Sequence, residues 1–475
     1  MSAKRRPERE HRSTQHEGGP VKLTVDAIRG CLEGAIPAQM ATSSPDGTPN
    51  VAYLSQVQYV DDEHVALSFQ FFNKTRQNVL ANPRATLLLV HPQTAAFYRL
   101  HVEYLRTETA GPLFETMKAK LAGIASHSGM AGVFRLLGSD VYRVHAIEVL
   151  PGESLPAPAP RCRLMPALRR TAERLARCRD LDGLLDETLA CLERELGIPH
   201  AMLLMADVPG ERLYTVGSRG YAASGVGSEI PFGCGVIGVA AREGTPIRIS
   251  HMTAEYAYLR SIRASAAEGG LAAMLETEIP PPGLADPHSQ LAVPIFGCGR
   301  LVGVLFVESA QDLRFGYDDE DALVTLAGQI GAAVLNLQAS AETPGDERAS
   351  AERPDAEAAP LGGAPVVVRH FAADHSVFLD DDYLIKGVAG AIFWALVRDH
   401  ADVRRTAFTN RELRLDPRIR LPDLSDNLEA RLILLERRLV ERRAAVRIEK
   451  TGRGRFRLRV DRPLQLVDVP SGRPG

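Results

Sequence analysis

Two groups of polar residues in this 475-residue chain have the types and spacing needed to bind an anion. Asn73-Lys74-Thr75 follows a strand-like run and opens a helix-like one. Asn73 can cap that helix, while Lys74 and Thr75 can reach an anion held by the N–H groups of its first turn. Towards the other end, residues 427–462 carry twelve Lys or Arg against five Asp or Glu. We expect the first group to hold a phosphate and the second to contact a polyanion.

The basic segment begins with a predicted helix. Four leucines at spacings of 4, 3 and 4 form its buried stripe: Leu428, Leu432, Leu435 and Leu439. Asn427, Arg431 and Arg438 project to one side of the stripe, and Arg442 lies nearby at the far end. A helix that offers Arg and Asn side chains from one flank can enter a major groove and hydrogen-bond base edges.

A basic hairpin is expected directly after this helix. Alternating residues over Val446–Val460 flank a glycine turn at Gly452 and Gly454. Arg453 and Arg455 lie in that turn, where they can contact phosphates or enter the minor groove. The alternative is a basic face that meets only solvent.

Other chemistry is not indicated. The six cysteines form no CxxC pair and no Cys/His cluster at zinc spacing, which fits a reducing compartment. No residue pair resembles a nucleophile with its base, so the sequence assigns no catalytic residue and no metal ligand. Gly233–Gly238 contains a G-x-G-x-x-G pattern, but no strand–helix–strand unit surrounds it, and we reject a dinucleotide-binding fingerprint.

Two composition breaks divide the chain into three folded pieces. Residues 151–163 form a proline-rich tether, and residues 339–365 lack the apolar residues needed to fold. These breaks give domains at residues 21–150, 164–338 and 366–469, preceded by a charged N-terminal stretch over 1–20 that we expect to be disordered.

Location follows by elimination. The N-terminus has no apolar core of a secretory signal, and the apolar stretch Val324–Leu337 is interrupted by polar residues and too short to span a bilayer. We therefore expect a cytoplasmic protein with no membrane contact. The formal net charge of -3 neither predicts nor excludes a nucleic-acid partner, because local charges of opposite sign cancel in the total.

The three pieces differ in their expected elements. The first is mostly short strands, including a hairpin over Asn50–Phe69, which favours a barrel. The second opens with a helix whose leucines share one face, alternates strands with helices and closes with a long helix from Asp318. The third passes from strands through helices to the basic hairpin. The fold class is thus multi-domain α+β.

The first piece resembles the pyridoxamine-phosphate-oxidase-like split barrel in Ile36–Thr42, Gly47–Val51, Val65–Phe69 and Asn73–Arg84. Many members of that family bind FMN at a dimer interface, which implies FMN as cofactor and a homodimer here. The resemblance implies cofactor-binding roles for four residues: Ser68, Asn73, Lys74 and Thr75. Other members hold haem, a deazaflavin or nothing. Four histidines are candidate haem ligands, although ordinary barrel histidines are the commoner case: His91, His101, His127 and His145.

The middle piece resembles the GAF domain, a small-molecule sensor fold, in Ile230–Gly238, Leu291–Ile295, Gly303–Ser309 and Phe315–Gln329. The resemblance implies a sheet floor and a lid formed by residues 250–290 over a ligand pocket. The stretch Ser309–Phe315 lacks the signature of cyclic-nucleotide-binding members, so the ligand stays unidentified. A GAF domain used only for dimer contacts is the alternative.

The third piece is similar to the winged-helix output domain of bacterial response regulators, with Ser376–Leu413, the Arg-rich helix and Lys450–Leu458 matching. In that family the last of three helices reads DNA and the closing hairpin carries a Gly-x-Gly-aromatic turn. The resemblance implies DNA-binding roles for six residues: Asn427, Arg431, Arg438, Arg442, Arg453 and Arg455. The long approach Arg414–Ser425 departs from the family pattern.

The order of split barrel, GAF domain and winged helix predicts a one-component sensory transcription regulator. Flavin or small-molecule binding would change dimer geometry, and the winged helices would read DNA. Two alternatives stay open. One is an FMN-dependent oxidoreductase with accessory GAF and winged-helix domains, and the other is a scaffold whose winged helix binds protein.

Overall fold

The computed structural model describes residues 23–32, 34, 36–54, 57–69, 74–127, 135–250, 279–342, 363–419, 421 and 427–470. Asn73, most of the expected lid, the N-terminal stretch and most of the second linker lie outside the described residues. The chain divides into two compact units. The first comprises Met1–Leu67, Phe72–Thr107 and Asp140–Pro156, and the second comprises the remaining residues, including Ala157–Gly475.

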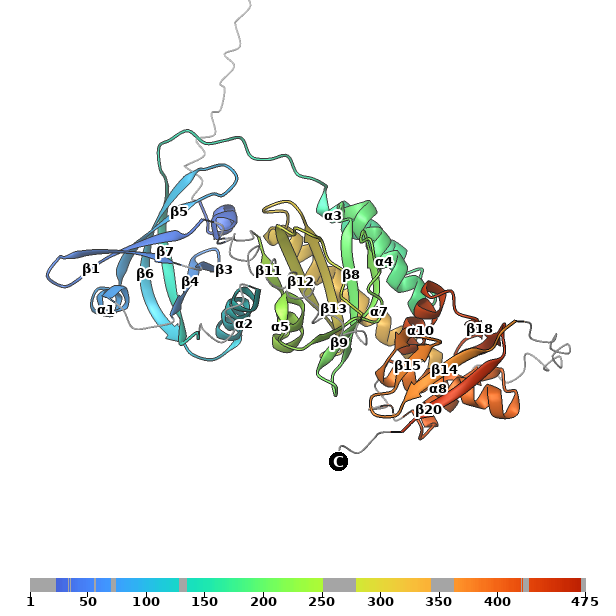
Figure 1. Ribbon diagram of the computed structural model, residues 1–475. Coiled ribbons are helices and arrows are strands. Elements are labelled where there is room, and N and C mark those ends of the chain that lie inside the picture. Colours follow the sequence, from blue (N-terminus) through green and yellow to red (C-terminus); the bar gives the residue numbers. More distant parts are fainter. Residues whose placement is uncertain are drawn as a thin grey trace, which may run out of the picture. The chain divides into compact units, whose positions relative to one another are not determined.

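The first unit is built around a seven-stranded sheet in the order β2-β1-β5-β6-β7-β4-β3 (Figure 1). Its strands are β1 (Ala38–Ser43), β2 (Pro49–Leu54), β3 (Val57–Asp61), β4 (His64–Phe69), β5 (Arg84–Val90), β6 (Phe97–Glu108) and β7 (Gly138–Val149). A 3-10 helix η1 (Asp26–Leu32) precedes them, and helix α1 (Lys74–Ala81) joins β4 to β5. The predicted hairpin is confirmed as the antiparallel pair β3 and β4.

The middle domain of the second unit is a six-stranded sheet in the order β10-β9-β8-β13-β12-β11. Its strands are β8 (His200–Asp207), β9 (Arg212–Arg219), β10 (Glu229–Pro231), β11 (Ile247–Ile249), β12 (Ser289–Gly297) and β13 (Arg300–Ser309). Its helices are α3 (Leu164–Leu175), α4 (Leu181–Leu196), α5 (Gly235–Glu243) and α7 (Tyr317–Glu342). The same unit includes α2 (Pro112–His127), whose Ala119 is buried with α5.

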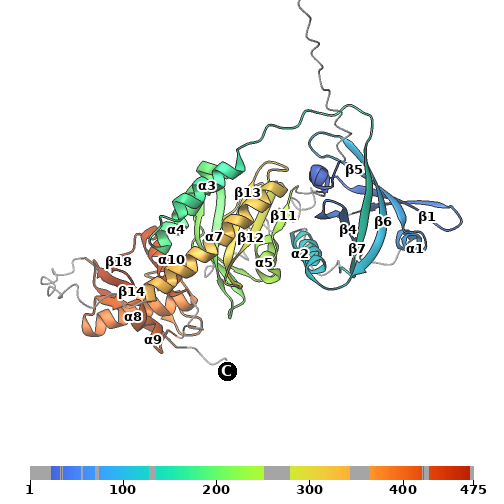
Figure 2. The same ribbon diagram turned by 180° about the vertical axis from the view of Figure 1, so that it is seen from behind.

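Apolar residues on both faces of this sheet explain its three layers. The leucine stripe of α4 packs with β8, β9 and α7 on one face, while α5 covers the other. Figure 2 shows α7 running across the sheet in front of β12. Asp180 starts α4 by accepting a 2.8 Å hydrogen bond from the N–H of Gly183. Gly197 ends the helix at a positive φ of 63°, which glycine adopts without strain.

The antiparallel sheet confirms that the G-x-G-x-x-G pattern is not a nucleotide fingerprint. β10 pairs antiparallel with β9 before α5 begins, so no parallel strand–helix–strand unit is present there. Gly238 instead allows close packing, since a Cβ at this position would lie 2.3 Å from the carbonyl oxygen of Pro231. The pattern therefore serves helix–strand packing.

One expectation about the apolar stretch Val324–Leu337 needs correction. It belongs to α7, and within the described residues Tyr317–Ser340 is long and apolar enough to cross a membrane by length and composition alone. In this fold, however, Leu323, Leu326 and Ile330 of α7 are buried against the sheet. The helix is thus part of the core of the middle domain.

The C-terminal domain, residues 363–470, combines two sheets with three helices. A four-stranded sheet has the order β16-β15-β14-β20, and a three-stranded sheet has the order β17-β19-β18. The strands are β14 (Val366–Phe371), β15 (Ser376–Leu379), β16 (Asp382–Ile385), β17 (Ala407–Thr409), β18 (Val446–Gly452), β19 (Arg455–Val460) and β20 (Leu464–Val469). The helices are α8 (Gly387–Val403), α9 (Asn410–Leu415) and α10 (Leu428–Glu441). The predicted basic helix and hairpin are therefore present as α10 and β18–β19.

Candidate functional site

The expected anion site of the first unit lies at the start of α1. Lys74 is the first residue of the helix and is exposed. Nearby, the pKa of the Asp46 carboxyl is lowered to about 2, chiefly by a hydrogen bond from Ser44, then by bonds from Thr48, with a smaller contribution from the charge of Lys74. Lys74 therefore offers a solvent-facing cation at a helix start. Ser68 lies near the end of β4 and is half-buried.

A hydrogen-bonded network fixes this helix to the sheet. The side-chain amide of Asn50 donates to the hydroxyl of Thr75 at 3.0 Å. Asn78, which is buried, donates to the hydroxyl of Thr42 at 3.1 Å. Because the Thr75 oxygen accepts a bond, its own O–H can still donate to a ligand. Sequence reasoning had found Thr75 but missed the asparagines, whose partners are distant in the chain.

Arg76, the next basic residue of α1, is bonded to other side chains of the protein. Its Nη1 lies 2.6 Å from Oδ1 of Asp140, and its Nη2 donates to the hydroxyl of Thr107 at 3.1 Å. This ion pair joins α1 to the long strands β6 and β7. Of the first helical turn, Lys74 and Thr75 are thus the described residues best placed for an anion.

The candidate haem histidines are held by other groups. His91 Nδ1 accepts the backbone N–H of Gln93 and of Thr94, both at 3.2 Å, and burial lowers its pKa. His101 and His145 line a cavity of about 640 Å³ but bond to carboxylates: His101 to Glu148 at 3.0 Å and His145 to Glu103 at 2.7 Å. The side chain of His127 lies outside the described residues. No group of three or more metal-binding side chains occurs among the residues that are described.

The middle domain buries a polar group that sequence reasoning missed. Glu308 is 2% exposed, and its carboxylate accepts the backbone N–H of Leu284 at 2.7 Å and the amide of Gln290 at 3.1 Å. The neighbouring Tyr221 has a raised pKa, mainly through burial and then through the charge of Glu308. Glu308 lies on β13 and Gln290 on β12, while Leu284 lies in the segment just before β12. These elements border the expected lid. The group is a buried polar cluster beside the segment for which the sequence predicts a lid.

The flank of α10 defined by Asn427, Arg431 and Arg438 (the α10 flank) is not free. Asn427 is the N-cap of α10, and its Oδ1 accepts the N–H of Ala430 at 2.9 Å. Arg431 is 4% exposed, and its Nη2 lies 3.3 Å from Oδ2 of Asp207. The guanidinium of Arg431 also stacks over Tyr214, 4.2 Å from the ring centroid. Both partners of Arg431 belong to the middle domain.

Arg438 is equally buried. Its Nε donates to the carbonyl of Leu384 at 3.1 Å, and its Nη1 donates to Glu441 at 2.6 Å. The expectation that the α10 flank projects from a free face is therefore wrong for this conformation. The physical reason is that α10 carries a second packed face. Leucines bind it to its own domain, and the flank binds it to the middle domain and to β16.

Arg437, which sequence reasoning did not select, anchors the same packing. Its Nη2 lies 2.7 Å from Asp182 and 2.6 Å from Asp186 on α4, and its Nη1 donates to the carbonyl of Val216 at 3.0 Å. Gly217 makes room for this guanidinium, since a Cβ there would lie 2.7 Å from Nη1. Only the tertiary structure brings these groups together, because more than 200 residues separate Arg437 from its partners in the chain.

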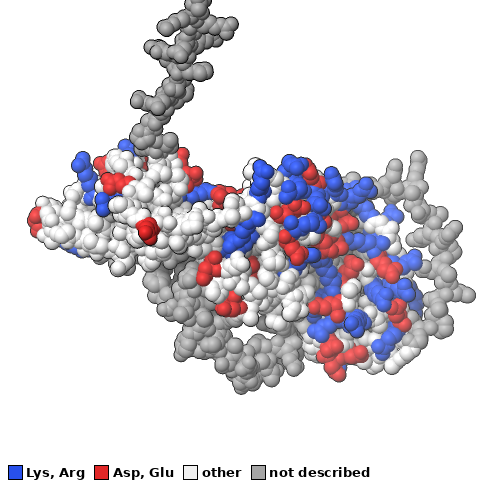
Figure 3. All heavy atoms as spheres, turned by 90° about the horizontal axis from the view of Figure 1, so that it is seen from above, with Lys and Arg blue, Asp and Glu red and all other residues white. Residues whose placement is uncertain are grey.

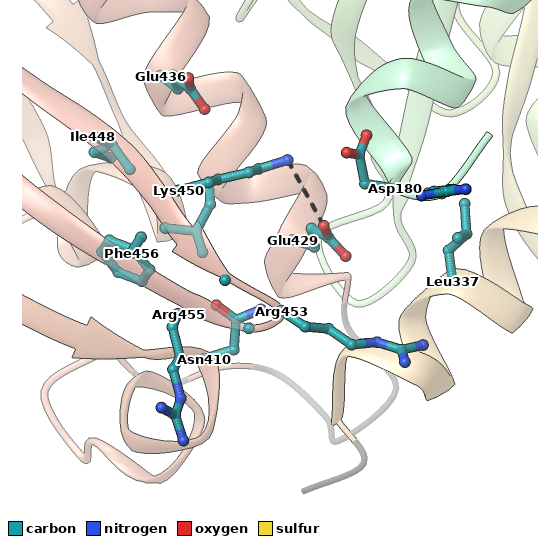
Figure 4. Close-up of a pocket in the computed structure, with 14 residues that line it drawn as sticks. Asp180, Leu337, Asn410, Glu429, Glu436, Ile448, Lys450, Arg453, Arg455 and Phe456 are labelled. Carbon is teal, nitrogen blue, oxygen red and sulfur yellow. Dashed lines mark ion pairs between the residues drawn. The ribbon is translucent and has the colours of Figure 1, made fainter. Parts of the chain in front are cut away.

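The hairpin β18–β19 presents its arginines differently. Arg453 and Arg455 are exposed at its turn, as is Arg442 at the end of α10. Figure 4 shows Arg453 extending towards Leu337 of α7, while Arg455 points away from Glu429. Lys450 reaches Glu429 with its Nζ 3.9 Å from the carboxylate. These residues line a cleft with a volume of about 570 Å³. Its wall combines the basic Lys450 and Arg453 with the acidic Glu429.

Charged surface side chains are also distributed unevenly between the two units. In Figure 3 the visible face of the N-terminal domain is mostly uncharged, whereas Lys and Arg side chains mixed with Asp and Glu gather over the second unit. On α3, for example, Arg169 pairs with Glu173 and Arg170 pairs with Glu195. Several exposed arginines there have carboxylate neighbours. At the hairpin turn, Arg453 and Arg455 form no ion pair with any described residue.

Comparison with protein families identifies two of the three domains. Residues 24–146 match the family model of pyridoxamine 5'-phosphate oxidase, and residues 178–335 match that of the GAF domain. The chain joins a pyridoxamine 5'-phosphate oxidase-like domain to a GAF domain. This pairing indicates a sensory or flavin-binding protein. The predicted split barrel and GAF fold are thereby confirmed, and together with the C-terminal sheets they make a mixed α/β multi-domain protein.

Solved structures similar to each domain share little sequence. The GAF domain of an Acinetobacter phosphoenolpyruvate-protein phosphotransferase is 20% identical, with 37% of this chain and 94% of that chain covered and a TM-score of 0.29. An FMN-binding protein from Syntrophomonas wolfei is 16% identical, with 26% of this chain and 88% of that chain covered and a TM-score of 0.22. HupZ from Group A Streptococcus is 22% identical, with 27% and 99% covered and a TM-score of 0.22.

Among curated proteins, an uncharacterized protein of Methanocaldococcus jannaschii is 35% identical over 89 residues. The match covers 18% of this chain and 58% of that relative, so the two proteins share a little over half of the relative's length.

Proposed function

We propose that this protein is a cytoplasmic one-component transcription regulator of the bacterial type. The pyridoxamine 5'-phosphate oxidase-like domain binds FMN, the GAF domain senses a small molecule, and the C-terminal domain is a winged helix that binds DNA as a homodimer. The observation that carries the DNA-binding part is the exposed, basic turn of the hairpin β18–β19 directly after the helices α8, α9 and α10.

The order of elements supports a winged helix. An initial antiparallel sheet, β14 to β16, is followed by three helices and a hairpin, as in the output domains that the sequence resembles. Helix α9 starts with a capping box, in which Thr409 and Glu412 bond reciprocally to each other's backbone N–H at 3.0 Å and 3.2 Å. This cap fixes the start of α9 directly after β17.

Exposed arginines supply the affinity that this proposal needs. In β19, Arg455, Arg457 and Arg459 alternate with buried residues and point to solvent. Arg447 of β18 lies opposite Arg459 in the register of the hairpin, and both guanidinium groups also pair with Asp461 at their exposed edge. A row of guanidinium groups on one ribbon can displace the counterions condensed on a duplex.

DNA binding is tested with the full-length protein and fluorescently labelled duplexes recovered by selection from fragmented genomic DNA. We expect salt-dependent binding. The double change Arg453→Ala and Arg455→Ala should reduce the slope of log affinity against log salt by about two, since each lost phosphate contact contributes about 0.9. The matched control, Arg169→Ala with Arg219→Ala on the GAF domain, should leave the slope unchanged. Absence of binding at low salt would remove the regulator proposal.

Flavin binding rests on Lys74 and Thr75 at the start of α1. Such a helix start favours a phosphate through its N–H groups and a positive dipole end, and Lys74 adds a full charge. The full-length protein should bind added FMN and quench its fluorescence. We expect Lys74→Ala to weaken this binding about fivefold to tenfold, in line with loss of one charge-assisted contact. Lys118→Ala on α2 is the control. An unchanged affinity in Lys74→Ala would place the flavin phosphate elsewhere.

A further inference from the structure

A second cavity lies where the GAF domain meets the first turn of α10. Its volume is about 630 Å³, which falls within the range of small-molecule sites. Apolar side chains form much of its wall: Met205, Pro209, Phe232, Phe296, Leu301 and Leu335. It shares none of its lining with the buried polar cluster of Glu308, Gln290 and Tyr221.

One buried polar group in this wall lacks a partner. Asn427 lines the cavity and is 8% exposed. Its Oδ1 is occupied as the cap of α10, but its Nδ2 is buried and has no hydrogen-bond partner among the described residues. A buried amide N–H₂ without an acceptor is costly, because it has lost water and gained nothing in return. An acceptor atom of a ligand would satisfy it.

The charges around the cavity specify the kind of acceptor. Arg300 lies on its rim at the start of β13, is exposed and forms no ion pair within the described part of the chain. Arg242 also lines the cavity and is bonded to Glu243 at 2.9 Å. The 14-residue helix α10 adds the positive end of its dipole beside Asn427. The net charge of Arg242, Arg300 and Glu243 together is positive. An anionic acceptor is therefore favoured over a neutral one.

We propose that this cavity binds a small carboxylic acid with an apolar body. The carboxylate accepts a hydrogen bond from Nδ2 of Asn427 and is attracted by Arg300. The apolar part lies among the aromatic and aliphatic side chains of the wall, such as Phe232 and Phe296. Apolar burial supplies most of the affinity, and the amide and the charges set the orientation.

Occupancy of this site bears on α10. A ligand here contacts strands of the GAF domain and the cap of α10 at once, so it stabilises the packing of the α10 flank against the GAF domain. That consequence for regulation rests on the proposed function, whereas binding itself does not. Ligand binding and DNA binding can therefore fail independently.

The test uses calorimetry on the full-length protein with 2-naphthoate and its neutral counterpart 2-naphthamide. We expect 2-naphthoate to bind and 2-naphthamide to bind at least about tenfold more weakly, because the amide lacks the charge. The informative variant is Asn427→Asp. Aspartate keeps the oxygen that caps α10 but replaces the free donor with an acceptor. It should abolish 2-naphthoate binding while the urea midpoint stays close to that of the unchanged protein.

A second variant protects the test against misfolding. Arg300→Gln changes an exposed turn residue and should weaken 2-naphthoate about fivefold. The control Arg169→Gln, on α3, should have no effect. Three outcomes would overturn the proposal: no 2-naphthoate binding at millimolar concentration, equal binding of the two compounds, or binding that neither Asn427→Asp nor Arg300→Gln alters. Since FMN and DNA binding are measured separately, none of these outcomes decides the proposed function.

Discussion

The α10 flank and the hairpin β18–β19 are neighbouring parts of one basic segment, yet the structure uses their arginines in opposite ways. Arg431 and Arg438 are buried at 4% and 3% exposure, whereas Arg453 and Arg455 are exposed. The flank holds domains together and the hairpin offers charge to solvent. Arginine content alone therefore does not identify a nucleic-acid surface, because a guanidinium serves equally well in a domain interface.

This difference has a consequence for the proposed regulator. If α10 is to enter a DNA groove, its contacts with Asp207, Asp182 and Asp186 must first break. The conformation described here accordingly leaves the hairpin available for phosphate contacts and keeps the α10 flank away from bases. Substitutions at Arg431 and at Asp182 with Asp186 separate these roles.

The largest expected effect is on stability. Arg431→Ala removes the buried partner of Asp207, leaves that carboxylate with the more exposed Arg212 as its charge partner at 3.4 Å, and removes the stacking on Tyr214. We expect a loss of about 3 kcal/mol in the free energy of unfolding of the second unit. The matched change Arg453→Ala at the exposed turn should cost less than about 0.5 kcal/mol. Urea unfolding monitored by circular dichroism measures both, and equal costs would contradict the contrast between flank and hairpin.

A medium effect is expected on DNA affinity. Asp182→Asn with Asp186→Asn removes both carboxylates that hold Arg437, and each partly exposed pair contributes about 0.2–1 kcal/mol. Weaker packing of α10 should raise DNA affinity about twofold to fivefold.

The same net charge change can be made without touching Arg437. Glu173→Gln with Glu187→Gln on α3 and α4 serves as this control, and should raise affinity less. If both pairs raise affinity equally, the gain reflects net charge, and release of α10 plays no part.

The smallest effect concerns pH. Burial raises the pKa of Glu429 above its usual value, an effect that Asp180 and Asp182 reinforce and that Lys450 and Arg453 oppose. The folded state thus keeps a proton that the unfolded state has already released, so stability falls as pH rises from about 4.5 through the raised pKa. Glu429→Gln should remove this fall and be the more stable form at neutral pH.

Urea midpoints measured from pH 4 to pH 8 test this. Glu436, whose pKa burial also raises, contributes to the same window and should retain part of the slope in the variant. Glu173→Gln on the surface of α3 should follow the unchanged protein. A Glu429→Gln curve parallel to that of the unchanged protein would show that Glu429 titrates normally.

Local sequence signals determined much of the fold. The antiparallel pair β3 and β4 lies within the hairpin predicted over Asn50–Phe69, and the turn of the basic hairpin lies at Gly452 and Gly454 as expected. The leucine spacing predicted α4 and α10, and Asn427 caps the latter. These features depend on neighbours a few residues away, through side-chain period, turn geometry and capping, and the chain therefore encodes them locally.

Only the tertiary structure decided which charged residues are free. The helical period placed Asn427, Arg431 and Arg438 on one flank but could not say that a second domain covers it. The partners of Arg431 in that domain, Asp207 and Tyr214, are more than 200 residues distant in the chain, and no sequence signal links them to α10. A domain interface forms because two independently encoded surfaces match in shape and charge. That match is a property of the folded surfaces, and no single segment of the sequence records it.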